Sequence, residues 1–210
     1  MSVIDKIAFF QDRRDDQPNK ELARQLVSDQ DRDGVAEIVA HLEDRNPNVQ
    51  SDCVKVLYEV GYLDPALIAG YGRNFLALLH SRNNRQVWGG MIALSTIAPL
   101  AADELFPQRE VIYMSIERGS VITVDAGVKT LAGIAAQGDE YRQALMPYLL
   151  RHLETCRPKE VPQHAEMALV AVDAANRQAF IAVLQQRMPD MRPAQVARLK
   201  RVIRQAEGLV

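Results

Sequence analysis

The feature that most constrains the fold is a helical pattern that returns about every 37 residues along the chain. In the copy that starts at Val49, the residues at offsets 4, 7, 8 and 11 have the spacing of one face of an α-helix. In successive copies these offsets hold Cys53, Val56, Leu57 and Val60; Gly90, Ala93, Leu94 and Ile97; Gly127, Thr130, Leu131 and Ile134; Ala165, Ala168, Leu169 and Val172; and, most weakly, Leu199, Val202, Ile203 and Ala206. Offset 4 is small in all copies but the last, and offset 8 is always a large apolar residue. Because size and hydrophobicity recur together, the pattern indicates an internal repeat.

Each repeated helix is preceded by a second apolar segment and a short polar turn. These first segments lie at residues 34–42, 74–79, 111–116, 148–153 and 180–184. One helical hairpin cannot bury its apolar face alone, so we expect each hairpin to stack on the next. The sequence therefore predicts an all-α fold, a right-handed α-α superhelix (solenoid) of about five to six helical hairpins that forms a single domain over residues 1–210.

Residues 1–33 predict an atypical first hairpin that caps the array. We expect one helix over residues 2–11 and another over residues 19–28, with Ser2 and Asn19 as N-caps. The charged turn between them fits an end repeat, whose outer face is usually polar.

Composition and charge argue against several classes of function. The formal net charge of -2 gives no general attraction to nucleic acid or anionic lipid, so nucleic-acid binding would need a local basic face. No segment approaches the ~20 apolar residues of a membrane span, and the first residues do not resemble a secretory signal. Cys53 and Cys156 lie within apolar helical patterns and are interpreted as reduced thiols. We expect a cytoplasmic protein with no membrane partner.

Residues 42–61 follow a distinctive order of residue types. The run Leu42-Glu-Asp-Arg-Asn-Pro-Asn-Val49 continues with Cys53, Val56-Leu57 and Val60-Gly61. This order closely resembles the HEAT repeat of the HEAT/armadillo superfamily, in which a leucine precedes an Asp-containing turn, then proline, valine, a small residue, an apolar pair and a β-branched residue. The resemblance covers residues 34–206, where residues 161–172 match nearly as well and the other copies are degenerate.

The chain departs from the family pattern at one position of the repeat. The family often has a basic residue where this sequence has Gln50, Val87, Val124 and Pro162. The charge ladder between repeats is therefore lost. The resemblance implies a protein-binding scaffold, the commonest role in such families. Some HEAT-like members are alkylpurine DNA glycosylases or phycobilin lyase-type proteins, and fold alone does not choose among these functions.

The resemblance also implies that the second helix of each hairpin lines a concave face. The residues expected to be exposed there form our candidate partner-binding set, which is Lys55, Tyr58, Trp88, Ile92, Asp125 and Lys129. An exposed tryptophan beside another apolar side chain and lysine is typical of an interface anchor. Alternatively, a rotation of the helix would bury Trp88 against Met91 in the core.

Two further pairs of residues at helical spacing have both a purely structural and a functional interpretation. Asp125 and Lys129 suit a surface ion pair, or an electrostatic or general-base role for Asp125 in a DNA glycosylase. His152 and Cys156 have metal-ligand spacing, but a zinc site would need a third ligand, such as His164 on the next helix. A surface histidine and a buried thiol are the simpler interpretation of this pair, so we assign no metal ligand, catalytic residue or cofactor.

The sequence thus predicts a non-enzymatic scaffold for a protein or peptide partner. A HEAT-like DNA glycosylase or lesion-binding protein is the alternative, and a phycobilin lyase-type protein is the third hypothesis. No nucleotide-binding or nucleophile motif is present in the sequence.

Overall fold

The computed structural model describes residues 2–209, apart from the side chain of Asp190. Contacts divide the chain into two compact units, Met1–Gly127 and Val128–Val210, and each is described by itself. Within residues 2–209 the secondary structure is helical and contains no strand, as predicted. No described helix is both long and apolar enough to cross a bilayer.

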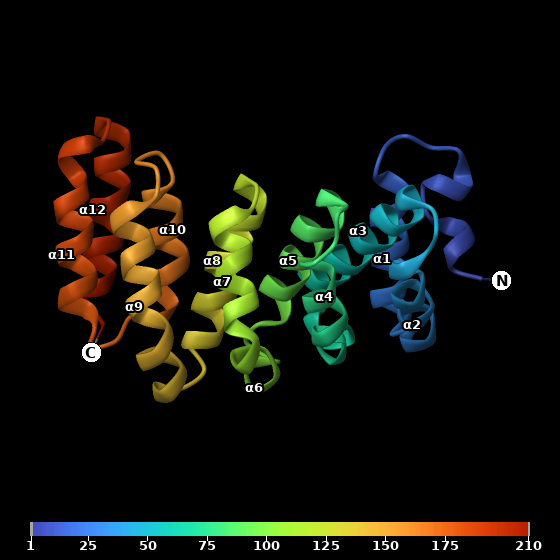
Figure 1. Cartoon of the computed structure of the whole chain (residues 1–210), viewed down its shortest axis with the longest axis horizontal. Helices are drawn as coiled ribbons and strands as arrows, with labels where there is room; N and C mark the ends of the chain where they lie inside the picture. Colours follow the sequence, from blue (N-terminus) through green and yellow to red (C-terminus); the bar gives the residue numbers. More distant parts are fainter. Residues whose placement is uncertain (1, 210) are drawn as a thin grey trace. The chain divides into compact units, whose positions relative to one another are not determined.

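The first unit consists of stacked helical hairpins (Figure 1). The second helices of successive hairpins pack directly on one another, α1 against α3 and α3 against α5, while α4 packs on α5 and α2 on α3. The α-helices of this unit are α1 (Gln17–Asp29), α2 (Arg32–Ala40), α3 (Pro47–Leu63), α4 (Gly72–Leu78), α5 (Asn84–Ile97), α6 (Ala102–Leu105) and α7 (Arg109–Arg118). Short 3₁₀ turns lie at Ile4–Lys6, Phe9–Gln11, His41–Glu43, Pro65–Leu67, Ala69–Tyr71 and Phe106–Gln108. Helix α8 (Val121–Ala135) contains the boundary between the units.

The second unit repeats the same arrangement. Helix α9 packs against α11, and α10 packs against α12 (Figure 1). The helices are α9 (Asp139–Thr155), α10 (Val161–Ala168), α11 (Arg177–Arg187) and α12 (Pro193–Glu207), with 3₁₀ turns at Leu169–Ala171 and Met188–Asp190. The predicted order of helix, turn and helix is therefore confirmed in both units.

The small residues at offset 4 permit the close packing that the repeat predicts. A Cβ atom added to Gly90 would lie 2.9 Å from Leu78 Cβ and 3.1 Å from the Phe75 carbonyl oxygen. At Gly127 it would lie 2.5 Å from Ile116 Cγ1. Helices α5 and α8 thus approach the preceding helix of their own hairpin to a distance that only glycine allows.

Uncharged hydrogen bonds link hairpins where the family's charge ladder is missing. Gln86 Nε2 donates to the Leu42 carbonyl oxygen at 2.6 Å, and so joins α5 to the turn of the preceding hairpin. Asn83 Nδ2, at the start of α5, donates to Gln50 Oε1 of α3 at 3.4 Å, and Gln50 Nε2 is held within its own hairpin by a bond to the Asp44 carbonyl oxygen at 2.7 Å. Side-chain amides therefore join the α2–α3 and α4–α5 hairpins.

The prediction for residues 2–11 is wrong, because two 3₁₀ turns replace the expected helix. The Ala8 N–H donates to Asn19 Oδ1 at 2.9 Å, and the Phe9 N–H donates to Asp52 Oδ2 at 2.8 Å. These distant side-chain oxygens take the donors that a continuous helix would use. Ser2 caps no helix and instead bonds Glu37.

The second N-cap prediction is also wrong, although α1 does form. The helix begins at Gln17, with Asp16 as N-cap, so Asn19 lies inside its first turn. Asn19 is almost fully buried and also donates from Nδ2 to Asp52 Oδ1 at 2.9 Å. Its side chain joins the first segment to α3 and does not cap α1.

Candidate interaction surface

Three aromatic side chains meet where α3 packs against α5. The Tyr58 and Trp88 ring centroids lie 6.1 Å apart, and the planes are tilted by 53°. Tyr62, one turn after Tyr58 on α3, makes an edge contact with it at a centroid distance of 6.0 Å. Trp88 is half-buried and Tyr62 is 55% exposed. The stacking of successive second helices thus creates an aromatic cluster that is partly open to solvent.

Lys55 lies over this cluster. Its Nζ atom is 4.7 Å from the Tyr58 ring centroid, 2.6 Å from Glu59 Oε1 and 3.0 Å from Asp16 Oδ2. Burial opposes the charged form of Lys55, but hydrogen bonds to Glu59, Tyr58 and Asp16 outweigh it and raise the lysine pKa. The ammonium group is therefore charged and held in place on the ring face.

Tyr58 is not exposed as the sequence predicted, since only 6% of it is accessible. Lys55 covers one side of its ring, and Trp88 and Tyr62 flank it. Burial raises the pKa of the Tyr58 hydroxyl. The tyrosine therefore supports the cluster from beneath, and Tyr62, which the sequence analysis missed, presents the accessible ring. The position of Tyr62 one helical turn after Tyr58 could have indicated that it shares the same face, but Tyr62 lies beyond the repeat offsets considered for exposed residues.

The remaining candidate residues occupy different environments. Ile92 is half-buried one turn after Trp88 on α5. Met91, which the alternative interpretation paired with Trp88, is fully buried, so Trp88 is neither wholly in the core nor fully exposed. Asp125 is half-buried in the part of α8 that belongs to the first unit, and Lys129 is exposed in the part that belongs to the second.

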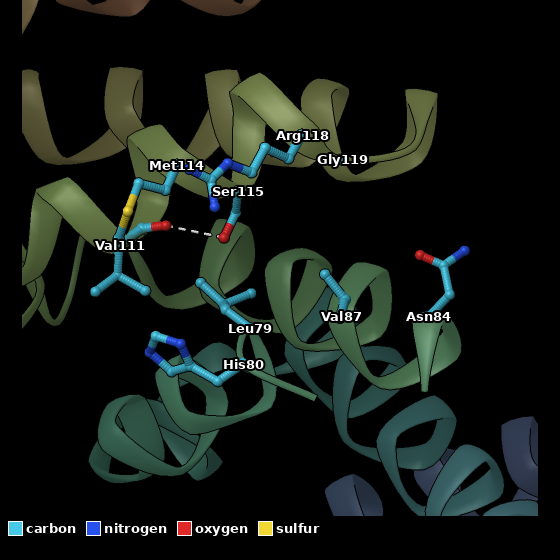
Figure 2. A pocket seen from close by; sticks show the side chains of 9 residues that line it. All are labelled: Leu79, His80, Asn84, Val87, Val111, Met114, Ser115, Arg118 and Gly119. Atoms are coloured by element: carbon cyan, nitrogen blue, oxygen red, sulfur yellow. Dashed lines mark hydrogen bonds between the residues drawn. The ribbon is translucent and has the colours of Figure 1, made fainter. Parts of the chain in front are cut away.

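A separate pocket of about 270 Å³ opens between α7 and the α4–α5 hairpin. Figure 2 shows Leu79 and Val87 on one side of it and Val111, Met114 and Ser115 of α7 on the other. Ser115 Oγ donates to the Val111 carbonyl oxygen at 2.8 Å, so its hydroxyl is used within the helix. Met114 is 43% exposed at the rim. The sequence analysis did not identify this pocket, because its lining comes from the first helices as well as the second.

The structure brings together the three side chains considered for a metal site. His152 is in the last turn of α9, Cys156 caps that helix, and His164 comes from α10. Their ligand atoms all lie within 4.8 Å of one another. All three residues belong to the second unit.

The stacked hairpins, whose second helices pack on one another, give this chain an all-α, HEAT/armadillo-like helical repeat fold. Comparison with solved structures supports this fold. An engineered protein is 20% identical, has a TM-score of 0.69, and is matched over 99% of this chain and 97% of its own. A designed armadillo repeat protein in complex with the peptide (KR)4 is 14% identical with a TM-score of 0.70, over 89% of this chain and 86% of its own.

A natural protein has the same fold over part of its length. The karyopherin Kap121p, bound to the SUMO protease Ulp1p, is 16% identical with a TM-score of 0.67, over 95% of this chain. This chain spans only 22% of that karyopherin chain. No protein-family model matches the sequence, and no curated protein matches it significantly. The HEAT/armadillo-like prediction for the fold is therefore confirmed by structure alone.

Proposed function

We propose that the chain is a non-enzymatic scaffold that binds a peptide or protein on the α3–α5 face, defined here as Lys55, Tyr58, Tyr62, Trp88 and Ile92. The observation that carries the proposal is the aromatic cluster, in which a half-buried Trp88 and an exposed Tyr62 both pack on a buried Tyr58. Pre-packed aromatic side chains bind with little loss of conformational entropy and are frequent hot spots of protein interfaces.

The solved structures support the same class of function. One structural neighbour was determined with the peptide (KR)4, and another with the protease Ulp1p. Stacked helical hairpins can therefore bind both a short peptide and another protein. For this chain, a partner that buries an apolar or aromatic side chain against Trp88 and Tyr62 fits the surface best.

The proposal can be tested by measuring how wild-type and variant chains bind a partner recovered with the wild-type protein from its native cells. Trp88→Ala and Tyr62→Ala should each weaken binding by about 10-fold or more, the loss expected for a hot spot. Leu100→Ala is the matched control, because Leu100 is 57% exposed, apolar and outside the α3–α5 face. Circular dichroism should show the same helical signal in all variants.

Intrinsic fluorescence gives a second readout, since Trp88 is the only tryptophan in the sequence. Binding at the α3–α5 face should shift or quench its emission in the wild type and in Leu100→Ala, and the concentration required should rise in Tyr62→Ala. Partner binding that leaves the Trp88 emission unchanged and persists in Trp88→Ala would contradict the proposed face.

The other hypotheses from the resemblance stay predictions. A DNA glycosylase would bind duplex DNA in a salt-sensitive way and lose base release in Asp125→Asn. A phycobilin lyase-type protein would bind an added tetrapyrrole. The aromatic cluster favours neither over a protein partner.

A further inference from the structure

Two histidine rings meet at the connection between α9 and α10. His152 Nε2 lies 3.0 Å from His164 Nδ1, and the ring centroids are 4.9 Å apart. His164 is fully buried, whereas His152 is half-buried. One shared proton can join the two nitrogens as a hydrogen bond, but a cation between them would be bound by both lone pairs.

A thiol completes the group. Cys156 Sγ lies within 4.8 Å of both histidine nitrogens and is half-buried. In a tetrahedral zinc site, nitrogens about 2.0–2.1 Å and a sulfur about 2.3 Å from the metal would be separated by roughly 3.3–3.6 Å. The 3.0 Å between the two nitrogens is already close to that value. Small rotations of the side chains would therefore suffice to bind an ion.

We propose that His152, Cys156 and His164 form a zinc-binding site that fastens the end of α9 to α10 and leaves a fourth coordination position for water. Two imidazole nitrogens and one thiolate are the ligands that zinc prefers, and a site with three protein ligands keeps one position open.

The end of α9 is fixed in a way that presents Cys156. The Arg187 guanidinium, which comes from α11 and is 9% exposed, donates to the carbonyl oxygens of Leu153 at 2.5 Å, Glu154 at 2.6 Å and Cys156 at 2.7 Å. These bonds hold the backbone that carries the thiol, so part of the ordering cost of a metal site is already met by the fold.

Charged side chains lie on more than one side of the thiol. Burial raises the pKa of Cys156 to about 11, while the nearby Arg187 guanidinium opposes this shift. The Glu160 carboxylate interacts electrostatically with both Cys156 and His164. The Glu160 carboxylate is also paired with Arg157, so the Cys156 thiolate would be the ligand charge that offsets part of the charge of a zinc ion.

Cobalt titration of the full-length, chelator-treated and reduced chain tests the site. Wild type should bind one Co²⁺ per chain, with a thiolate-to-cobalt charge-transfer band that zinc abolishes. Cys156→Ser should lose the band, and both Cys156→Ser and His152→Ala should bind at least about 10-fold more weakly, since removal of a ligand costs no less than removal of its supporting hydrogen bond.

His80→Ala provides the matched control, because His80 is exposed and lies in the first unit. It should bind cobalt as the wild type does. Zinc should also raise the unfolding temperature of wild type and His80→Ala, but not that of His152→Ala. A wild type without the charge-transfer band, or a Cys156→Ser variant that keeps it through the buried Cys53, would overturn the proposal.

Discussion

The Trp88 indole packs on the ring of Tyr58 at a centroid distance of 6.1 Å, so the more exposed ring depends on the buried one for its position. Tyr58 thus contributes to stability, whereas Trp88 and Tyr62 offer surface to a partner. This division of roles makes the two tyrosines a matched pair for mutation.

Tyr58→Ala should lower the free energy of unfolding by about 3 kcal/mol, because it removes a buried aromatic ring. Tyr62→Ala should change the same quantity by less than about 1 kcal/mol, since Tyr62 is 55% exposed. Urea denaturation followed by circular dichroism measures both. Equal losses in the two variants would contradict the burial assigned to Tyr58.

Arg187→Met should destabilise the chain by about 3 kcal/mol, because three carbonyl oxygens at the end of α9 would lose a charged donor. Arg187→Lys keeps the charge, but one ammonium cannot reproduce the fork of a guanidinium, so we expect an intermediate loss. Arg204→Met is the control, since Arg204 is exposed on α12. In thermal unfolding, Arg187→Met should have the lowest Tm, Arg187→Lys an intermediate Tm, and Arg204→Met a Tm close to that of the wild type.

Gly90→Ala should destabilise the chain by roughly 1–2 kcal/mol, even though alanine is the better helix former by about 1 kcal/mol. The new Cβ would lie 2.9 Å from Leu78 Cβ and 3.1 Å from the Phe75 carbonyl oxygen, and a backbone atom cannot easily move away. Gly70→Ala is the control, because nothing lies within 4 Å of its added Cβ. A stabilised Gly90→Ala protein in a urea titration would show that α4 and α5 are farther apart.

Asn19→Ala should cost about 2 kcal/mol of unfolding free energy, since the buried Ala8 N–H would lose its acceptor. Gln17→Ala, an exposed change on the same helix, should cost much less. Hydrogen exchange gives a direct readout, because the Ala8 amide should lose protection in Asn19→Ala and keep it in Gln17→Ala.

Glu37 should give stability that depends on pH. Its carboxylate accepts hydrogen bonds from Ser2 and from the Val3 and Ile4 N–H groups. Burial opposes ionisation, but these bonds outweigh it and hold the Glu37 pKa below its ordinary value of 4.5. The stabilisation is therefore complete above that value and is lost as the pH falls through the lower folded pKa.

Glu37→Gln should consequently be less stable than wild type at neutral pH, and the difference should shrink at an acidic pH below the folded Glu37 pKa. Urea midpoints at the two pH values measure it. Glu21→Gln, an exposed change on α1, should show no comparable pH dependence.

The sequence was sufficient to predict the hairpins because their signal is periodic and repeated. Small residues such as Gly90 and large ones such as Leu94 recur at fixed offsets, and the structure buries both. Residues 2–11 could not be predicted in this way, because their backbone donors are taken by Asn19 and Asp52, which lie far along the chain. Local helix signals contain no information on such bonds.

The candidate surface was predictable only in part. Helical offsets placed Trp88 and Lys55 near the surface, but the burial of Tyr58 follows from side chains that cover it from two helices. Likewise, the spacing of His152 and Cys156 suggested a pair, but the position of His164 depends on how α10 packs on α9. Side chains that meet across helices are set by packing angles, which a single helical period does not define.

The amide links of the first unit have a consequence for its behaviour in concentrated salt. Mobile ions weaken attractions between exposed charges, but they hardly affect a neutral hydrogen bond such as that from Gln86 Nε2 to the Leu42 carbonyl oxygen. A repeat array whose layers are joined by a charge ladder loosens as ionic strength rises. Here glutamine and asparagine join the α2–α3 and α4–α5 hairpins, so the contact between these two hairpins should persist at high salt. The Lys55–Asp16 ion pair, which joins α3 to the first hairpin, should weaken under the same conditions.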